Sequence, residues 1–313
     1  MKVLVTGGSG YLGSAVVKAL VERGYQVSCL QRGKYPHLNQ LGIDIHQGDI
    51  AEAGIVSNAS KDCEMIIHIA GLTGIWGPYS HYYHTNVTGT KQVIEACLHN
   101  GIRKLVYTSS PSVIFDGSDE ENVNESMSYP QHYFNHYQRT KSEAEKMVLA
   151  ANSKSLATVA LRPHLIWGPD DPHLIARIID RAKTGRLRLV KGILNRVDTT
   201  YIDNAVDAHL LAADHIDIGS SCAGKVYFIT NGEPIPMSDL INRILKAAGM
   251  SSISKTAPAS ILYLIGQLSE LIYRLLNINR AITMFLNCCL LKLFPLNIVN
   301  HKLKFFQELL FHK

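Results

Sequence analysis

The chain has 313 residues, of which 46% are hydrophobic and 18% are charged, and this balance excludes an intrinsically disordered protein. Its formal net charge of +5 comes from residues 251–313, which hold seven Lys and Arg against two Asp and Glu. Residues 1–250 contain 24 basic and 24 acidic residues. This part of the chain therefore lacks the excess of basic residues that is typical of a protein that binds nucleic acid.

The first half of the chain alternates short apolar runs with helical patterns, which predicts parallel β-α-β units. In chain order we expect a strand at 2–6, a helix at 11–23, strands at 26–30, 43–48 and 64–70, a helix at 85–100, a strand at 104–109, a helix at 131–152 and a strand at 157–161. The strands are nearly continuous apolar runs, typical of parallel strands buried on both faces. We therefore predict an α/β fold with a Rossmann-type doubly wound parallel sheet in residues 1–162.

The rhythm changes after residue 162. We expect helices at 174–184, 206–215 and 238–248 and a strand near 225–230. These elements predict a smaller C-terminal α/β lobe on the substrate side, formed by residues 163–258 and interleaved with the first domain.

Residues 259–313 form an apolar and basic tail. Its two apolar stretches, 259–276 and 281–299, are interrupted by polar residues such as Glu270 and Lys292, so neither favours a helix that spans a membrane. We expect a pair of helices that covers the substrate pocket, with peripheral contact at a membrane surface as the alternative.

The cysteines and histidines do not indicate a metal. None of the six cysteines forms a C-x-x-C pair, and the 14 histidines include no H-E-x-x-H pattern. The cysteines are typical of small apolar residues in a reducing compartment, and no secretory signal follows Met1. We therefore expect no metal and a cytoplasmic location, and we leave a homodimer open.

A glycine-rich turn joins the first predicted strand to the first helix. Residues 6–13 read Thr-Gly-Gly-Ser-Gly-Tyr-Leu-Gly. In a dinucleotide site Gly7 permits the tight turn, Gly10 admits the pyrophosphate and Gly13 allows close packing of helix on strand. A purely structural turn is the alternative, but the strand–turn–helix context favours a dinucleotide next to Gly7, Gly10, Tyr11, Leu12 and Gly13.

The end of the second strand predicts the choice of cofactor. A site for NAD carries an acid here for the ribose 2′-hydroxyl, whereas this chain has Arg32, whose guanidinium suits a 2′-phosphate. This favours NADP(H), with Lys34 assisting; a solvated surface arginine is the alternative for Arg32, and NAD(H) stays open. Asp49 follows the third strand, where it can accept from the adenine amino group, cap the next helix, or do both.

Three residues carry the expected chemistry. Tyr137 and Lys141 are one helical turn apart, so the phenol and the ammonium share a face. A neighbouring ammonium lowers the pKa of a phenol, which makes Tyr137 a candidate acid and base. Ser110 follows the fifth strand, at the sheet edge where ligands of such folds bind, and can orient a substrate carbonyl.

Four nearby polar residues have competing interpretations. Ser109 and Ser112 fit turn chemistry beside Pro111. His164 is either a substrate contact or a loop residue, and Asn86 more plausibly satisfies buried backbone than performs chemistry.

Taken together, the motifs resemble an extended short-chain dehydrogenase/reductase, and within it the 3β-hydroxysteroid dehydrogenase branch. The matching pieces are the loop 6–13, Gly48-Asp49, residues 68–71, residues 86–90, Ser109-Ser110, Tyr137 with Lys141, and Arg162-Pro163. Residues 161–169, 197–204 and 229–236 are similar to bacterial reductases that act on β-keto acids. The resemblance covers about residues 1–276, and the tail beyond it is atypical of the family.

The resemblance implies an NAD(P)H-dependent oxidoreductase that interconverts a ketone and a secondary alcohol on a small apolar substrate. Tyr137 would be the acid and base, Lys141 its partner and ribose anchor, and Ser110 the carbonyl-orienting group. Ile50, Ala70 and Pro163 would complete the cofactor site. A nucleotide-sugar epimerase and a non-enzymatic cofactor-binding protein are the alternatives; a dehydratase is disfavoured because Pro111 and Ser112 occupy the positions of its Asp–Glu pair.

Overall fold

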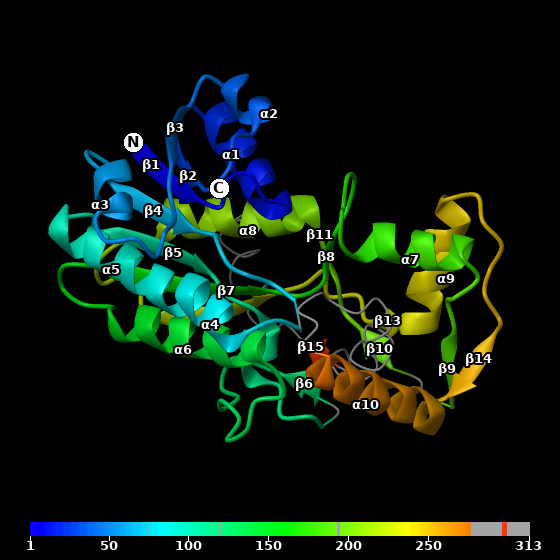
Figure 1. Cartoon of the computed structure of the whole chain (residues 1–313). Helices are drawn as coiled ribbons and strands as arrows, with labels where there is room; N and C mark the ends of the chain where they lie inside the picture. Colours follow the sequence, from blue (N-terminus) through cyan, green and yellow to red (C-terminus); the bar gives the residue numbers. More distant parts are fainter. Residues whose placement is uncertain (75, 119, 193–194, 277–295, 299–313) are drawn as a thin grey trace.

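The computed structural model describes residues 1–313 except 75, 119, 193–194, 277–295 and 299–313. At its centre is a parallel sheet of seven strands (Figure 1). In spatial order the strands are β12 (Lys225–Ile229), β7 (Ala157–Pro163), β5 (Lys104–Thr108), β4 (Met65–His68), β1 (Lys2–Thr6), β2 (Gln26–Gln31) and β3 (Asp44–Gln47). The order reverses direction beside β1, which is the arrangement of a doubly wound Rossmann fold.

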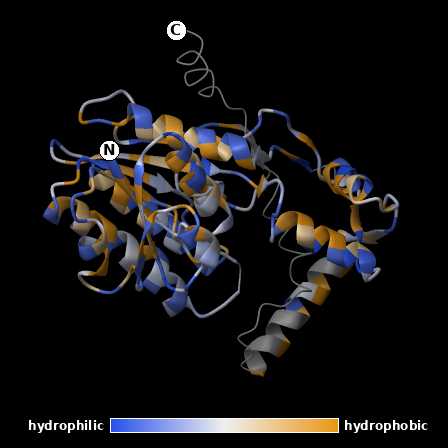
Figure 2. Ribbon diagram, turned by 90° about the horizontal axis from the view of Figure 1, so that it is seen from above, coloured by the Kyte–Doolittle hydropathy of each residue, from blue (hydrophilic) through white to orange (hydrophobic). Residues whose placement is uncertain are grey.

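Helices cover both faces of the sheet because its strands are apolar on both sides. Helices α1 (Tyr11–Glu22) and α8 (Ile202–His215) pack on one face, and α3 (Ile55–Ala59), α5 (Gly89–His99) and α6 (His136–Ala150) pack on the other. Hydrophobic residues gather within this layered interior, and hydrophilic residues are frequent on the outer loops (Figure 2). The sheet and the two layers of helices on its faces together fix the carboxyl ends of the strands at one edge of the sheet.

The second half of the chain contributes to two regions. Strand β12 and helix α8 join the central sheet and its covering layer. Helices α7 (Leu174–Lys183) and α9 (Met237–Ala247) share a separate apolar cluster to one side (Figure 1). Beside them lie the short strand pairs β8 (Ile166–Trp167) with β11 (Thr200–Tyr201), β9 (Leu189–Lys191) with β14 (Thr256–Pro258), and β10 (Arg196–Val197) with β13 (Ile235–Pro236).

The smaller elements complete the described chain. They are α2 (Pro36–Asn39), α4 (Tyr79–Tyr82), the π-helix Tyr83–Thr88, the 3-10 helix Pro111–Ile114, α10 (Ala259–Leu275), and the pair β6 (Glu120–Val123) with β15 (Leu296–Ile298). Across the part of the chain that the structure describes, no helix combines the length and the apolar character that crossing a bilayer requires.

The fold class and the strands of the first half are confirmed, but several helix bounds differ from expectation. The helix predicted from residue 131 begins at His136, because the side chain of Asn135 accepts a 2.8 Å hydrogen bond from the Gln138 amide and caps the helix there. The helix predicted at 85–100 is the last part of a longer run that starts at Tyr79 and passes through the π-helix.

Two further differences concern the second half. Helix α8 starts at Ile202 rather than residue 206. In the tail, residues 296–298 form a strand instead of the end of a second helix, and the rest of that predicted helix, 281–295 and 299, lies outside the described residues.

Candidate active site

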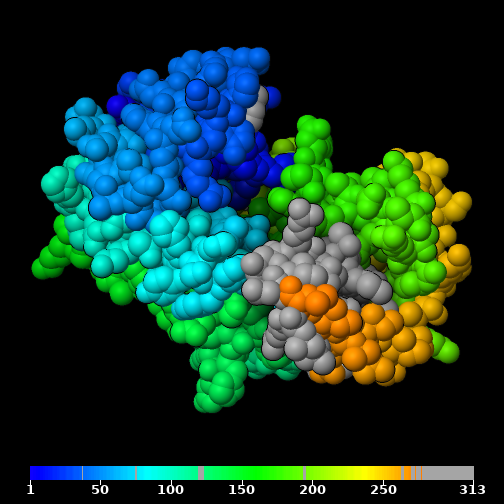
Figure 3. Space-filling view, viewed as in Figure 1, coloured from blue at the N-terminus to red at the C-terminus, as the bar shows by residue number. Residues whose placement is uncertain are grey.

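A cavity of about 680 Å³ lies at the carboxyl ends of the central strands, between them and α7. The molecule is visibly hollowed there, between the blue N-terminal residues and the green segment that contains α7 (Figure 3). All predicted cofactor residues except Lys141 share this one cavity: its lining includes Gly7, Gly10, Tyr11, Leu12, Gly13, Arg32, Asp49, Ile50, Ala70 and Pro163. Ser110 and Tyr137 line it too, so residues spread over 150 positions of sequence meet at one sheet edge.

The glycine-rich loop between β1 and α1 has two glycines, Gly7 and Gly13, at positions that leave no room for a side chain. Gly7 has φ of +73°, and a Cβ on it would lie 2.7 Å from the Ala70 amide nitrogen. A Cβ on Gly13 would collide with the Gly7 carbonyl. The turn therefore brings the backbone and the start of α1 directly to the cavity wall, where a pyrophosphate would meet free amides.

The end of β2 provides the basic side chain at one end of the cavity. Arg32 is exposed and lines the cavity next to Leu30 and Gln31, and no acid of this strand end reaches the cavity. On the next strand end, Asp49 accepts a 2.9 Å hydrogen bond from the Ala51 amide through Oδ1. This contact stabilises a turn and is not the predicted helix cap, because the next helix, α3, begins at Ile55 with Gly54 at its N-cap position. The Oδ2 of Asp49 lies 3.5 Å from Nε2 of His84 and still faces the cavity.

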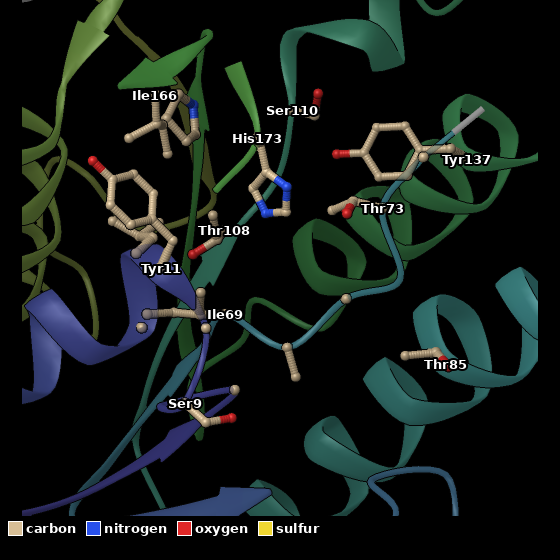
Figure 4. A pocket seen from close by; sticks show the side chains of 18 of the residues that line it. Ser9, Tyr11, Ile69, Thr73, Thr85, Thr108, Ser110, Tyr137, Ile166 and His173 are labelled. Carbon is tan, nitrogen blue, oxygen red and sulfur yellow. The ribbon is translucent and has the colours of Figure 1, made fainter. Parts of the chain in front are cut away.

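Ser110 and Tyr137 lie at the opposite end of the cavity. The Tyr137 hydroxyl points toward its centre, on the side of Ser110 (Figure 4). The Ser110 Oγ is 2.9 Å from the Ser112 Oγ and accepts from the Ser112 amide at 3.3 Å. The predicted turn role of Ser112 thus holds the Ser110 hydroxyl in place.

Lys141 occupies a different position from the one expected. It is 4% exposed and does not line the cavity; its Nζ donates a 2.7 Å hydrogen bond to the Thr108 carbonyl and lies 4.2 Å from the centre of the Tyr107 ring. A Cβ on Gly71, which does line the cavity, would lie 3.8 Å from Nζ. The ammonium of Lys141 therefore lies behind the cavity wall, and Gly71, which has no side chain, lies between it and the cavity.

The pKa of Tyr137 also differs from the sequence-based expectation. Burial raises this pKa above its ordinary value of 10.0, and a hydrogen bond with Ser110 opposes the rise. Burial lowers the pKa of Lys141 to about 7, against the attraction of Glu145, so its charge is itself costly in this environment. The shift favours the protonated phenol, and Ser110 is the neighbour that opposes it.

Asn86 and His164 both contact backbone groups of other segments. The amide of Asn86 bonds both backbone groups of Leu72, at 2.7 and 3.1 Å, and also the Thr140 hydroxyl, as predicted for a group that satisfies buried backbone. His164 lines the cavity, but its Nδ1 lies 2.6 Å from the Asp198 carbonyl and burial lowers its pKa to about 4. It is a neutral ring held in the wall.

Three residues at the site carry no motif in the sequence. His209 of α8 is fully buried, and its Nε2 lies 2.7 Å from the Thr108 hydroxyl, which faces the cavity (Figure 4). His173 and Arg177 line the cavity from the start of α7. The spacing of His173 and Arg177, four residues apart, was the one feature of the sequence that could have pointed to this pair. Such a spacing is common in proteins and therefore not specific.

The arrangement fits a nicotinamide dinucleotide. The close contacts of Gly7 with Ala70 and of Gly13 with the Gly7 carbonyl hold the turn tight against the strand ends, and one continuous cavity leads from Arg32 to Tyr137. The carboxyl ends of the strands β1, β2, β3, β4, β5 and β7 border this cavity, at the sheet edge where such folds bind their ligands.

Comparison with known proteins supports the same conclusion. The model of the 3-beta hydroxysteroid dehydrogenase/isomerase family matches residues 4–258. A 2-alkyl-3-oxoalkanoate reductase of Stenotrophomonas maltophilia is 46% identical over 287 residues, which cover 89% of this chain and 85% of that protein. The sterol-4-alpha-carboxylate 3-dehydrogenase of Mus musculus is 38% identical over 251 residues, which cover 78% of this chain and 68% of that protein. Both relatives are oxidoreductases by name.

Solved structures share the fold. The enzyme MoeE5 in complex with UDP-glucose and NAD has a TM-score of 0.70 at 25% identity, with 82% of this chain and 85% of that chain covered. The predicted resemblance to the β-keto acid reductases and to the steroid dehydrogenase branch is thereby confirmed.

Proposed function

The chain belongs to the 3-beta hydroxysteroid dehydrogenase/isomerase family, and from this premise we propose that it reduces the ketone of a 3-oxo acid with an apolar chain, preferring NADPH. It is a nicotinamide-dependent oxidoreductase that interconverts ketones and alcohols, as its relatives are. The single observation that carries the proposal is that Ser110 and the Tyr137 hydroxyl meet at the end of a cavity floored by the dinucleotide loop.

We assign the acid role to Tyr137. Because burial raises the pKa of its phenol, the hydroxyl holds its proton at neutral pH and can donate it to a carbonyl oxygen. Ser110 hydrogen-bonds the same oxygen and favours the phenolate that is left behind. A bound NADPH would supply the hydride to the carbonyl carbon.

We assign Lys141 to the positioning of this end of the cavity. Its bond to the Thr108 carbonyl ties α6 to β5, and the bond of His209 to the Thr108 hydroxyl ties α8 to the same residue. Tyr137 lies on α6, and Ser110 lies in the segment after β5. These two bonds therefore fix the positions of the two hydroxyls relative to each other.

NADPH rather than NADH is proposed because of Arg32. The guanidinium is exposed at the end of the cavity, where the ribose of a dinucleotide lies in this fold, and can bind a 2′-phosphate in two-point fashion.

The direct test is a reaction of the purified protein with NADPH and 3-oxododecanoate, followed by the loss of NADPH absorbance and by mass spectrometry of the product. We expect one 3-hydroxydodecanoate for each NADPH oxidised, and slower reaction with NADH. A protein that binds NADPH yet leaves 3-oxo acids unchanged, or that interconverts UDP-sugars instead, would contradict the proposal.

A further inference from the structure

We propose that His173, the residue before α7, and Arg177 of α7 bind the carboxylate of the substrate and so select 3-oxo acids over neutral ketones. This inference rests on the proposed function, because it assigns the acid group of that substrate to two residues of the same cavity. Both side chains line the cavity, and the His173 imidazole points into its centre, toward the hydroxyl of Tyr137 (Figure 4).

The two residues are suited to act as a pair. They are four positions apart at the start of α7: His173 is the N-cap residue that precedes the helix, and Arg177 lies within it. Both are exposed to the cavity. The opposite side of α7 is apolar, with Ile178 buried in the cluster that α7 forms with α9, and this packing fixes the helix and therefore the direction of the two basic groups.

The charge of Arg177 is not used elsewhere among the residues that the structure describes. No ion pair of the described chain involves Arg177. Burial lowers the pKa of Arg181 on the same helix, and the charge of Arg177 lowers it further. A guanidinium at a cavity wall without an acid partner favours an anionic ligand, and its geometry suits a carboxylate.

The backbone of the same helix cannot provide this recognition. The carboxylate of Asp171 accepts from the amides of His173, Leu174 and Ile175, at 2.8 to 3.3 Å, so the first turn of α7 is already capped by the chain itself. Recognition of an anion here depends on side chains.

The position fits the chemistry of a 3-oxo acid. Its carboxylate is separated from the ketone carbon by a single carbon atom, so an acid held by His173 leaves the ketone close by in the cavity. The Tyr137 hydroxyl and Ser110 lie on one side of the cavity, and the His173 imidazole lies across from them (Figure 4). One substrate of this length would satisfy both sides at once, and its apolar chain would follow the remaining lining.

The test compares 3-oxododecanoate with its methyl ester, which has the same ketone and chain without the charge. For Arg177→Met and His173→Gln we expect kcat/KM for the acid to fall about 10- to 100-fold, the range of a charge-assisted hydrogen bond, with the value for the ester nearly unchanged. Lys183→Met, an exposed cation of the same helix that does not line the cavity, is the matched control and should change neither value.

Three outcomes would overturn the assignment. If Arg177→Met lowers the values for acid and ester equally, the residue is structural; if it weakens NADPH binding by the same factor, it serves the cofactor. If the wild-type protein reduces the ester as well as the acid, and no variant changes that ratio, the carboxylate site is wrong while the reductase remains. A wild-type protein inactive on both compounds would refute the proposed function itself.

Discussion

The ammonium of Lys141 donates a 2.7 Å hydrogen bond to the carbonyl oxygen of Thr108, at the point where β5 ends. This bond fastens the helix that carries Tyr137 to the strand that leads into Ser110. Gly71 stands between Nζ and the cavity and presents no side chain. The lysine is thereby part of the framework that brings the two hydroxyls together.

Arg32 should decide the choice of dinucleotide. We predict that Arg32→Gln raises the Kd for NADPH about 10- to 100-fold, because a charge-assisted contact to the 2′-phosphate is lost, while the Kd for NADH hardly changes. Fluorescence titration with both cofactors measures this. Lys18→Gln on the exposed side of α1 is the control, and equal effects on NADPH and NADH would argue against the assignment.

The buried histidines should make the fold sensitive to acid. Burial lowers the pKa of His68 to about 3 and those of His164 and His209 to about 4, against 6.5 in an unfolded chain. Between pH 6.5 and 4 these histidines are protonated in the unfolded chain but stay neutral in the folded protein. The free energy of unfolding therefore falls as pH falls, by about 1.4 kcal/mol per pH unit for each such histidine.

His209→Gln tests this directly. The amide can still hydrogen-bond the Thr108 hydroxyl but does not titrate. Urea unfolding across this pH range should give a slope shallower by about 1.4 kcal/mol per pH unit than that of the wild-type protein. Identical slopes would show that His209 is protonated equally in both states.

The ion pair of Arg162 and Glu145 should matter for stability more than any surface pair. Both side chains are 2% exposed or less, with two hydrogen bonds of 2.5 and 2.9 Å, and the Tyr129 hydroxyl donates a third to Glu145. Arg162→Met should lower the free energy of unfolding by about 3 to 5 kcal/mol, because it leaves a carboxylate buried without its partner.

A surface pair on the same helix offers the comparison. Arg139 bonds Glu143 at 2.8 Å, but its side chain is 52% exposed, and Arg139→Met should cost less than about 1 kcal/mol. The double variant Arg162→Met with Glu145→Leu should recover much of the loss, since it removes the unpaired charge. Chemical denaturation measures all three, and equal losses for the two single variants would contradict this account.

Much of the site could be predicted from the sequence because its residues belong to local patterns. The glycines of residues 7–13 are required by the turn itself, and Ser110 follows a strand whose end had to lie at the ligand edge. Tyr137 stood out by its place on a helix after that strand. In each case the chemistry and the local structure are encoded within a few residues.

Other features depended on contacts between distant segments. The pKa of Tyr137 is set by burial under neighbouring elements, and Lys141 lies behind Gly71, a residue 70 positions away. His209 reaches Thr108 from a helix 101 residues later. His173 and Arg177 gain meaning only because α7 packs on α9 and turns its polar side to the cavity.

The replacement Tyr137→Phe, measured by single-turnover reduction of 3-oxododecanoate with NADPH, tests the central claim most directly. We predict a rate about 10²- to 10⁴-fold lower, the usual contribution of a general acid, with an unchanged Kd for NADPH. Tyr133→Phe, whose hydroxyl contacts Ser142 outside the cavity, should keep the wild-type rate. A Tyr137→Phe protein that reduces the ketone at the wild-type rate would contradict the account.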